Sequence, residues 1–330
     1  MLAIGLKNPG LGIVAAILVA VASAPAAELE LLRVARISGD AKHCAFTDLA
    51  RFNDAFYCAW REGSSHVSAD GKLRVVRSAD GTNWTPVALM TRAGADLRDA
   101  KLEVTPDKRL MLHGIEKFSD GSSPLRRNVA WFTTDGTTWS APVHIAEDDI
   151  CFWKHTWHKG TGYGVGYACA PPYFARLYTS KDATHWTTQV ATLNNSGYVN
   201  ESRIVFMPDD TAHCLLRRDD GTRTALLGTA APPYTRWTWQ DLGRQIGGPE
   251  MIRLPDNRLL AAVRQYPQAT WLCWVSPKSG TLTPALKLPS GGDTSYAGMV
   301  WHDERLWVSY YSSHEKRTGV YIAEVAYNQP

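Results

Sequence analysis

The stretch Ser78-Ala-Asp-Gly-Thr-Asn-Trp84 places a polar turn ahead of a tryptophan, and the pattern returns twice along the chain. The second copy is Thr133-Thr-Asp-Gly-Thr-Thr-Trp139, and the third is Ser180-Lys-Asp-Ala-Thr-His-Trp186, which has Ala183 in place of the glycine. A degraded fourth copy ends at Trp237. Asp-Gly favours a tight turn between two strands, and the tryptophan can cover the side of a sheet. The tryptophans lie roughly 50 residues apart, which indicates a repeated structural unit.

Six segments share a second pattern, in which an apolar strand ends in a Pro-Asp-like turn and another apolar strand follows. Such a turn predicts a hairpin, and two more strands joined at the heptad would complete a four-stranded blade. We therefore predict an all-β fold, a six-bladed β-propeller. The strand at 31–37 is expected to pair with the last blade near 320–325, because closing the ring removes unpaired sheet edges. The six segments are 45–54, 98–107, 151–160, 200–209, 247–256 and 294–303.

The composition is compatible with one large domain, since the 330 residues are 45% hydrophobic and 10% aromatic. Residues 1–26 read as a signal peptide, because Lys7 precedes an apolar run at 11–22 and Ala24-Pro-Ala26 offers small residues for cleavage. The run is too short to predict a membrane-spanning helix. We expect residues 27–330 to form a single propeller domain, periplasmic or secreted, with no stable membrane insertion after the signal is cleaved.

Charge and cysteine content narrow the expected partners. The formal net charge is +3 and no basic run occurs, so nucleic acid is not an expected partner. Six cysteines suit an oxidising compartment but are too few for a disulfide scaffold. Cys151 and Cys169 lie symmetrically about a predicted turn at 159–160, where they could face each other across two strands. No ligand spacing indicates zinc, so neither a metal nor another cofactor is predicted.

Side chains from all six blades are expected to meet at one end of the central channel, because the first strand of each blade lines it. Aligning the six turns places one residue of each first strand at a similar height. Aligning the second strands by their ends does the same for Arg61, Arg217 and Arg264. The heptads belong to loops at the opposite end, where a structural role is expected. The residues on the first strands are Asp48, Asp99, Lys154, Glu201, Glu250 and Tyr296.

This constellation has two interpretations. Arginine binds carboxylates through two parallel hydrogen bonds, so the three arginines could hold an acidic ligand. They could equally form structural ion pairs with nearby acidic residues, which are Asp48, Glu62, Glu201 and Glu250. Tyr296 is a candidate nucleophile, which needs a base because a free phenol has a pKa of about 10. Glu201 could be that base, and His66 on a rim loop could contact the ligand.

On these residues the chain resembles the sialidase (neuraminidase) superfamily, whose heptad is called the Asp box or bacterial neuraminidase repeat. The resemblance extends over essentially all of the chain after residue 26. It implies that Tyr296 is the nucleophile, Glu201 its partner, and Arg217 and Arg264 two of three arginines that bind the substrate carboxylate. Beyond the heptads, the motifs that carry it are Arg98-Asp99, Asn200-Glu-Ser202 followed by Arg217, and Ser295-Tyr296.

The chain departs from the family in the first blade. Sialidases have Phe-Arg-Ile-Pro there, whereas this chain has Phe-Thr-Asp-Leu at 46–49, so Thr47 replaces an arginine of the triad. Arg61 on the next strand is a candidate to compensate. Three carboxylates compete for the role of the family's acid/base aspartate, namely Asp48, Glu62 and Asp99.

The sequence therefore predicts an exported exo-acting glycoside hydrolase that removes a terminal, acidic sugar from a glycan substrate. A substrate without a carboxylate would remove the reason for a tyrosine nucleophile. Two carboxylates among Asp48, Asp99, Glu201 and Glu250 would then serve, as in arabinan-cleaving propellers. The same residues are also compatible with a polysaccharide lyase that uses tyrosine or histidine as base, and with a non-catalytic glycan-binding propeller.

Overall fold

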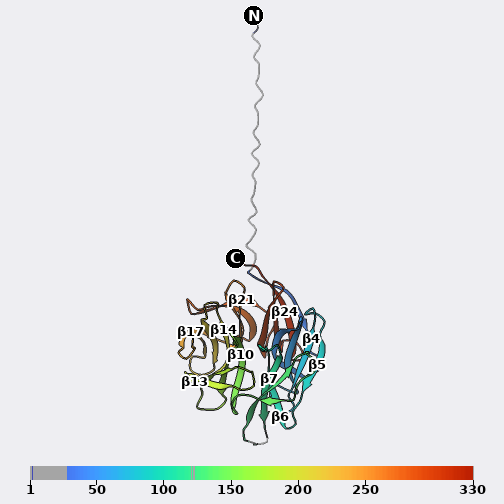
Figure 1. The fold of residues 1–330 in the computed structure, drawn as a ribbon. Coiled ribbons are helices and arrows are strands. Elements are labelled where there is room, and N and C mark those ends of the chain that lie inside the picture. The colour runs from blue at the N-terminus through green and yellow to red at the C-terminus, as the bar shows by residue number, and fades with distance from the viewer. Residues whose placement is uncertain (1, 3–27, 120, 122, 330) are drawn as a thin grey trace.

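The computed structural model describes residues 2, 28–119, 121 and 123–329 (Figure 1). Its strands form six four-stranded sheets, which confirms the predicted all-β, six-bladed propeller. Across the described ranges, no helix has the length and apolar character needed to cross a membrane. The predicted signal peptide, residues 1–26, lies outside the described residues apart from Leu2.

Each blade contains strands that follow one another along the chain, with the innermost strand first. Blade one consists of β2 (His43–Phe52), β3 (Ala55–Gly63), β4 (Lys72–Ser78) and β5 (Thr85–Met90), and blade two of β6 (Ala95–Val104), β7 (Leu110–Phe118), β8 (Arg126–Thr133) and β9 (Val143–His144). Blade three consists of β10 (Ile150–His158), β11 (Thr161–Ala168), β12 (Ala175–Ser180) and β13 (Thr187–Asn194), and blade four of β14 (Val199–Phe206), β15 (Ala212–Arg218), β16 (Thr224–Ala230) and β17 (Thr238–Gln245). Blade five consists of β18 (Gly247–Arg253), β19 (Leu259–Gln265), β20 (Ala269–Ser276) and β21 (Thr281–Lys287).

The sixth blade closes the ring with strands from both ends of the described chain. It contains β22 (Thr294–His302), β23 (Arg305–Ser312), β24 (Gly319–Tyr327) and, outermost, β1 (Leu29–Arg36). The pairing of β1 with β24 joins Leu31 to Val325 and Arg36 to Tyr321, as the sequence predicted. Figure 1 shows the blue β1 and the red β24 on the same side of the molecule. This pairing gives β24 a neighbour on its outer side and thereby completes the ring.

The heptads form the loops that join the third and fourth strands of blades one, two and three. In the first of them Asp80 Oδ1 accepts hydrogen bonds of 2.8 Å from the backbone nitrogens of Thr82 and Asn83. Trp84 Nε1 donates to the Gly81 carbonyl oxygen at 3.1 Å. The other two heptads repeat the hydrogen bonds to the aspartate. These loops lie at the end of the blades opposite to the start of the inner strands.

Each of the six inner strands has an irregularity in its pairing at a similar distance from its start. The pairing register of each one shifts near its start, for example between Arg98 and Lys101 in β6 and between Ser295 and Gly298 in β22. A bulge of this kind adds a residue to one strand and re-aims the side chains beside it. Asp99 (φ 56°) and Tyr296 (φ 51°) occupy two of these bulges in the left-handed region. The bulges thereby turn side chains from different blades toward one cleft.

Candidate functional site

A cleft of about 210 Å³ lies at the channel end where the inner strands begin. Its wall combines residues from blades one, two, three, four and six. It includes three predicted site residues from inner strands, Asp99, Glu201 and Tyr296, together with His66 from the loop after β3. The other lining residues are Phe46, Val67, Arg98, Ile115, Lys117, Arg126, Cys151, Tyr167, Cys169 and Tyr198.

Tyr296, Glu201 and Arg217 form a hydrogen-bonded group from blades six and four. The Tyr296 hydroxyl donates to Glu201 Oε1 at 2.5 Å and accepts from Arg217 Nη1 at 3.0 Å. Arg217 Nη1 also lies 2.7 Å from Glu201 Oε2. The Gly248 backbone nitrogen donates to the same oxygen at 3.0 Å. A side chain at Gly248 would collide with the Tyr296 ring, so this glycine permits the close approach.

The electrostatics of this group favour a neutral phenol beside an ionised carboxylate. Burial, and then the Glu201 charge, raise the pKa of Tyr296 well above its ordinary value. Burial alone would raise the pKa of Glu201, but the Arg217 charge and the hydrogen bonds from Tyr296 and Arg217 outweigh it and lower that pKa. The hydroxyl therefore needs a base to become a nucleophile, and Glu201 is in contact with its proton.

Asp99 is the other carboxyl group on the cleft wall. Burial raises its pKa above the ordinary value, although the charges of Arg98 and Lys101 oppose the shift. Among the described residues, no hydrogen-bond donor contacts this carboxyl, so its oxygens are available to a ligand. A carboxyl group with a raised pKa that faces a cleft is suited to donate a proton.

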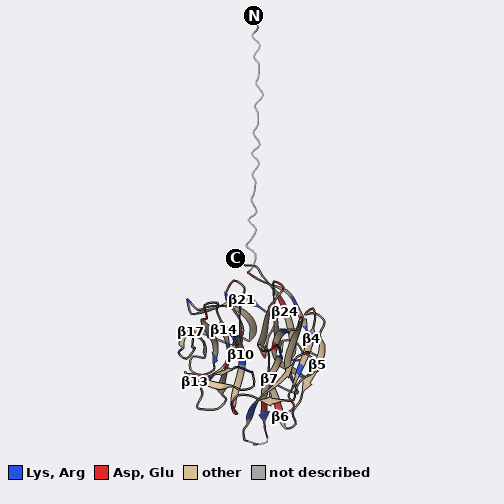
Figure 2. Ribbon diagram, viewed as in Figure 1, with Lys and Arg blue, Asp and Glu red and all other residues tan. Residues whose placement is uncertain are grey.

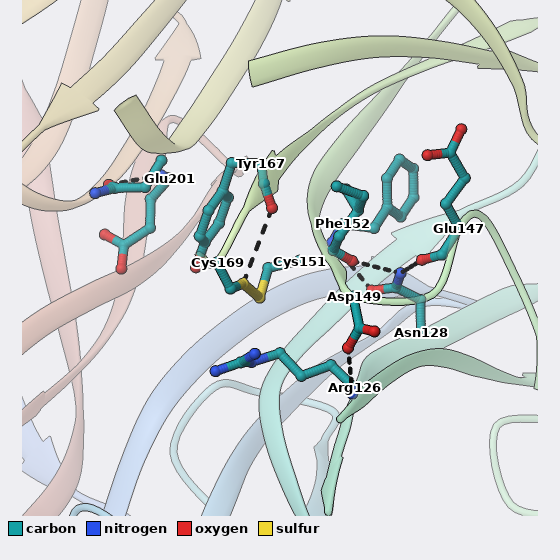
Figure 3. Close-up of a disulfide and its surroundings, with 11 residues drawn as sticks. Arg126, Asn128, Glu147, Asp149, Cys151, Phe152, Tyr167, Cys169 and Glu201 are labelled. Atoms are coloured by element: carbon teal, nitrogen blue, oxygen red, sulfur yellow. Dashed lines mark hydrogen bonds between the residues drawn. A yellow bond between two sulfur atoms is a disulfide. The ribbon is translucent and has the colours of Figure 1, made fainter. Parts of the chain in front are cut away.

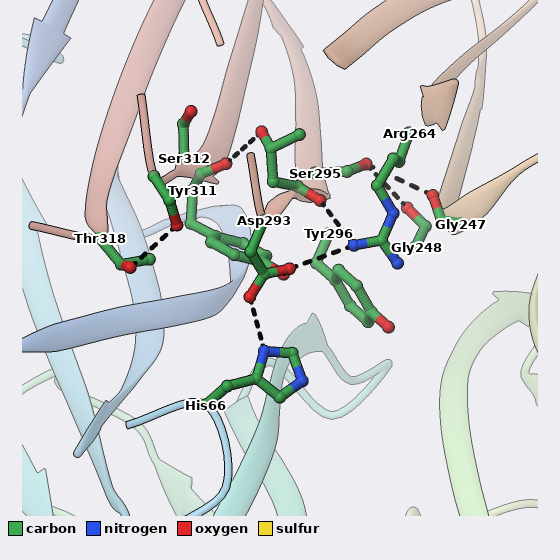
Figure 4. A network of polar contacts seen from close by, with 12 residues as sticks. His66, Gly247, Gly248, Arg264, Asp293, Ser295, Tyr296, Tyr311, Ser312 and Thr318 are labelled. Atoms are coloured by element: carbon green, nitrogen blue, oxygen red, sulfur yellow. Dashed lines mark hydrogen bonds and ion pairs between the residues drawn. The ribbon is translucent and has the colours of Figure 1, made fainter. Parts of the chain in front are cut away.

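Asp293 connects Arg264 to the cleft rim (Figure 4). Arg264 Nη1 lies 3.1 Å from Asp293 Oδ1, and the Tyr311 hydroxyl donates to the same oxygen at 2.6 Å. His66 Nδ1 is 2.5 Å from Asp293 Oδ2. The Arg264 guanidinium carbon lies 5.8 Å from the centre of the Tyr296 ring, so this arginine flanks the proposed nucleophile.

One group of described residues, His43, His66 and Asp293, has ligand atoms within 4.8 Å of one another, as a metal site requires. The charge of Arg264 already neutralises Asp293 and would repel a cation there. We therefore interpret the group as an ion-pair network that joins the His66 loop to blade six.

Two predicted carboxylates, Asp48 and Glu250, lie inside the channel and do not line the cleft. Lys154 Nζ bridges them, at 2.8 Å from Asp48 Oδ1 and 3.0 Å from Glu250 Oε2. Asp48 also accepts a hydrogen bond from the Leu102 backbone nitrogen, and Arg203 forms an ion pair with Glu250. Their exposed fractions are 0% and 4%, so these paired buried charges join blades rather than contact a ligand.

Arg61 and Glu62 also differ from the sequence prediction. Arg61 is 0% exposed and lies 2.7 Å from Asp96, and it donates to the carbonyl oxygens of Ser65 and Ser68. It supports the loop that carries His66 and cannot replace a ligand-binding arginine. Glu62 points to the other side of β3, where it accepts hydrogen bonds from Trp60 and Arg74.

The predicted alignment of the three arginines is off by one residue in blade four. Arg61 and Arg264 each pair with a residue just before the bulge of the inner strand. In blade four Arg218 has this position, opposite Val199, and Arg217 is its neighbour.

Cys151 and Cys169, which the sequence indicated could face each other, form a disulfide between β10 and the residue that follows β11 (Figure 3). Both cysteines line the cleft. Three further basic residues, Arg98, Lys117 and Arg126, also line the cleft. Sequence reasoning missed them as site residues. The signal that could have found Lys117 and Arg126 was their position on neighbouring strands of one predicted blade.

No protein-family model and no curated protein matches the sequence. The fold is similar to that of a protein of unknown function from Dyadobacter fermentans, with a TM-score of 0.80, 18% identity and coverage of 91% of this chain and 100% of that chain. It is similar to an alpha-L-arabinanase from Penicillium chrysogenum solved with arabinobiose, with a TM-score of 0.67, 16% identity and coverage of 85% and 93%. It is also similar to a sialidase from Trypanosoma rangeli, with a TM-score of 0.64, 10% identity and coverage of 86% of this chain and 55% of that chain. The chain thus has the six-bladed propeller fold that a sialidase and an arabinanase share.

Proposed function

We propose that the protein is an exo-acting glycoside hydrolase in which Tyr296 is the nucleophile, Glu201 its base and Asp99 the acid. The observation that carries the proposal is the hydrogen-bonded group of Tyr296, Glu201 and Arg217 on the wall of a cleft. The cleft volume of about 210 Å³ is below the roughly 300–1,000 Å³ of sites for larger ligands, which suits one terminal sugar.

In the first step the Tyr296 oxygen forms a bond to the anomeric carbon while its proton passes to Glu201. The bond from that carbon to the leaving oxygen breaks, and Asp99 gives its proton to this oxygen. Arg217 contacts both the Tyr296 oxygen and Glu201, so its charge stays beside the group as the proton moves.

In the second step Asp99, now ionised, takes a proton from a water molecule that attacks the anomeric carbon. The bond to the Tyr296 oxygen breaks, and Glu201 returns its proton to that oxygen. The sugar leaves with a new hydroxyl, and all three side chains regain their starting protonation states.

We propose an acidic terminal sugar as the substrate. Arg217 and Arg264 flank Tyr296, and Arg98 lines the cleft beside Asp99. A neutral nucleophile also avoids repulsion from a carboxylate carried by the anomeric carbon. The buried Thr47 provides no third arginine at the position that sialidases use, so the carboxylate would be held by a set of cations different from theirs.

A second candidate is a hydrolase of a neutral sugar that uses two carboxylates, Glu201 and Asp99, without covalent participation of Tyr296. The missing arginine at Thr47 favours it, and Asp99, whose pKa is raised by burial, would be the acid in this reaction as in the first. In this reaction Tyr296 would only position Glu201.

Cleavage of aryl glycosides of sialic, keto-deoxy and neutral sugars tests both candidates. If Tyr296 is the nucleophile, Tyr296→Phe should lower kcat by about a thousandfold or more. The control Tyr310→Phe removes a phenol that, within the described residues, donates its hydrogen bond to the Pro289 carbonyl oxygen, and it should leave kcat unchanged. If Tyr296→Phe keeps most activity while Glu201→Gln and Asp99→Asn lose it, the two-carboxylate reaction is correct. Binding of glycans without turnover would contradict both, and an unsaturated, ultraviolet-absorbing product from uronate polymers would show a lyase.

A further inference from the structure

The cleft wall formed by blade two carries more positive charge than its surroundings neutralise. Asp96 is paired with two guanidinium groups, at 2.7 Å from Arg61 and 2.9 Å from Arg98. Lys117 lies opposite Asp96 in the pairing of β6 with β7, but both oxygens of that carboxylate are already engaged. Arg126 lies opposite Lys117 in the pairing of β7 with β8. The cations outnumber the acid in this row of side chains.

Lys117 and Arg126 therefore form a like-charge pair across two strands. Residues directly opposite on neighbouring strands have Cβ atoms about 4.5–5.5 Å apart, and like charges at this distance destabilise a sheet. Burial, and then the charges of Arg98 and Arg126, lower the pKa of Lys117. In the described part of the chain, no carboxylate is paired with the ammonium group of Lys117 or the guanidinium group of Arg126.

The two unpaired cations, Lys117 and Arg126, face the cleft. They line it together with Tyr296 and Glu201, as does Arg98, whose guanidinium group is paired with Asp96. Figure 3 shows the Arg126 side chain extended below the disulfide toward the side where Glu201 lies. The hydrogen bonds between Arg126 and Asp149 involve the Arg126 backbone and not its guanidinium group. Figure 2 shows neighbouring basic segments at the lower edge of the molecule, below the label of β7.

The position of the cations within the blade indicates which part of a substrate they would meet. Asp99 is on the inner strand β6, Lys117 is on β7 and Arg126 is on β8. Neighbouring strands are about 4.8 Å apart, so the two cations lie progressively outward from the proposed acid. An acid must stand beside the oxygen of the bond that breaks. The leaving group would therefore extend along blade two, past Lys117 and Arg126.

We propose that Lys117 and Arg126 form a subsite for an anionic group, a carboxylate or a sulfate ester, on the sugar next to the scissile bond. This inference rests on the proposed function, because that function defines the side of the leaving group. The substrate would then be a glycan in which the penultimate sugar is a uronate or is sulfated. Such an anion would neutralise the like-charge pair and gain charge-assisted hydrogen bonds.

Cleavage of a set of disaccharides tests the subsite. All of them would carry the same terminal sugar, which is the one that the aryl-glycoside screen identifies as preferred. Their second sugar would be galacturonate, its methyl ester, galactose 6-sulfate or galactose. We expect kcat/KM about tenfold higher for a charged second sugar than for its neutral counterpart, and a decrease of this advantage with added salt. The comparison of galacturonate with galactose 6-sulfate identifies which anion is preferred.

The variant Lys117→Gln/Arg126→Gln should abolish this advantage and leave kcat/KM for an uncharged aryl glycoside within about twofold. The control Lys181→Gln/Lys278→Gln removes the same charge from the opposite end of the blades and should retain the advantage. Because the substitutions relieve repulsion, the thermal midpoint of the double variant should not fall. Equal cleavage of charged and neutral disaccharides, or an advantage that survives in the double variant, would overturn the subsite.

If the protein cleaves no glycoside, the subsite can still be tested by measuring the binding of sugars. Calorimetric titration of the full protein with galacturonate and galactose 6-sulfate, against galactose, measures the anion preference directly. A preference for the charged sugars that the double variant loses would support the subsite and leave only the hydrolase in error. Equal affinity for all three sugars would reject the subsite whatever the catalytic activity.

Discussion

The Thr47 hydroxyl donates a 2.8 Å hydrogen bond to the backbone carbonyl oxygen of Tyr296, and so connects blade one to the strand that carries the proposed nucleophile. Thr47 is 0% exposed, and its oxygen is also 3.0 Å from the Ser309 hydroxyl. Where sialidases place an arginine that reaches the substrate, this chain has a buried polar contact between two blades.

Replacing Thr47 with valine keeps the shape and removes this contact. We expect Thr47→Val to lower the free energy of unfolding by about 1–3 kcal/mol, because it leaves the buried carbonyl of Tyr296 without this partner. Activity should fall as well, since the bulge that holds Tyr296 loses a constraint. Denaturant unfolding measures the first effect. The exposed Thr85→Val on β5 is the control and should change neither quantity.

The pH dependence of cleavage should be bell-shaped, because Glu201 must be ionised and Asp99 protonated. The pKa of Glu201 is lowered and that of Asp99 is raised. Activity should therefore rise as Glu201 ionises below its ordinary range and decline at higher pH as Asp99 loses its proton. Asp99→Asn should remove the limb at higher pH and affect aryl glycosides with good leaving groups least. A profile in which Asp107→Asn has the same effect would contradict the assignment.

Glu103 should make the stability of the protein depend on pH. It lies 3.9 Å from Arg203, the arginine that also pairs with Glu250 inside the channel. Burial raises its pKa to about 7, although the Arg203 and Lys154 charges oppose the shift. A raised pKa in the folded state adds stability below the unfolded value of 4.5, and this contribution is lost as pH rises through 7. Glu103→Gln should therefore stabilise the protein above pH 7, by up to roughly 3 kcal/mol, and have little effect in acid. Thermal unfolding from pH 4 to 9 measures this, with the exposed Glu30→Gln as control.

His113 and His155 should contribute acid sensitivity. Their rings stack between blades two and three with centroids 5.4 Å apart, and none of their ring nitrogens has a hydrogen-bond partner within the described residues. Burial lowers the pKa of His113 to about 3. A lowered pKa adds stability above the unfolded value of 6.5, and this is lost as pH falls toward the folded value. His113→Phe should flatten the decrease of the thermal midpoint between pH 6.5 and 4, whereas the exposed His144→Phe should not.

The fold could be predicted from the sequence because its signals are local. Each heptad contains its own turn chemistry, and each inner hairpin has its own turn, so their spacing indicates blades without knowledge of long-range contacts. Ring closure followed from the need to pair the edge strands. The Tyr296 and Glu201 pairing followed from placing inner strands at one height.

The errors in the site arise from side-chain direction, which strand alignment does not determine. Successive residues of a strand point to opposite faces, so Arg61 and Glu62 could not both face the cleft, and here neither does. Alignment of the turns placed Asp48 and Asp99 at the same height. In the structure Asp99 lies within the bulge of its strand, whereas Asp48 lies after the bulge of its strand and therefore deeper in the channel. Lys117 and Arg126 can be identified as a pair only from the register of β7 with β8, which places them opposite each other.

The pairing of β1 with β24 has a consequence for the synthesis of the protein. The outermost strand of the last blade is translated before every other strand of the described chain, and its partner is translated last. Throughout translation β1 is an edge without its native neighbour, and such edges promote aggregation. Its charged residues, Glu30, Arg33 and Arg36, are the kind that keep a waiting strand soluble. Because contacts between distant parts of a chain form slowly, we expect ring closure to be a late event in folding.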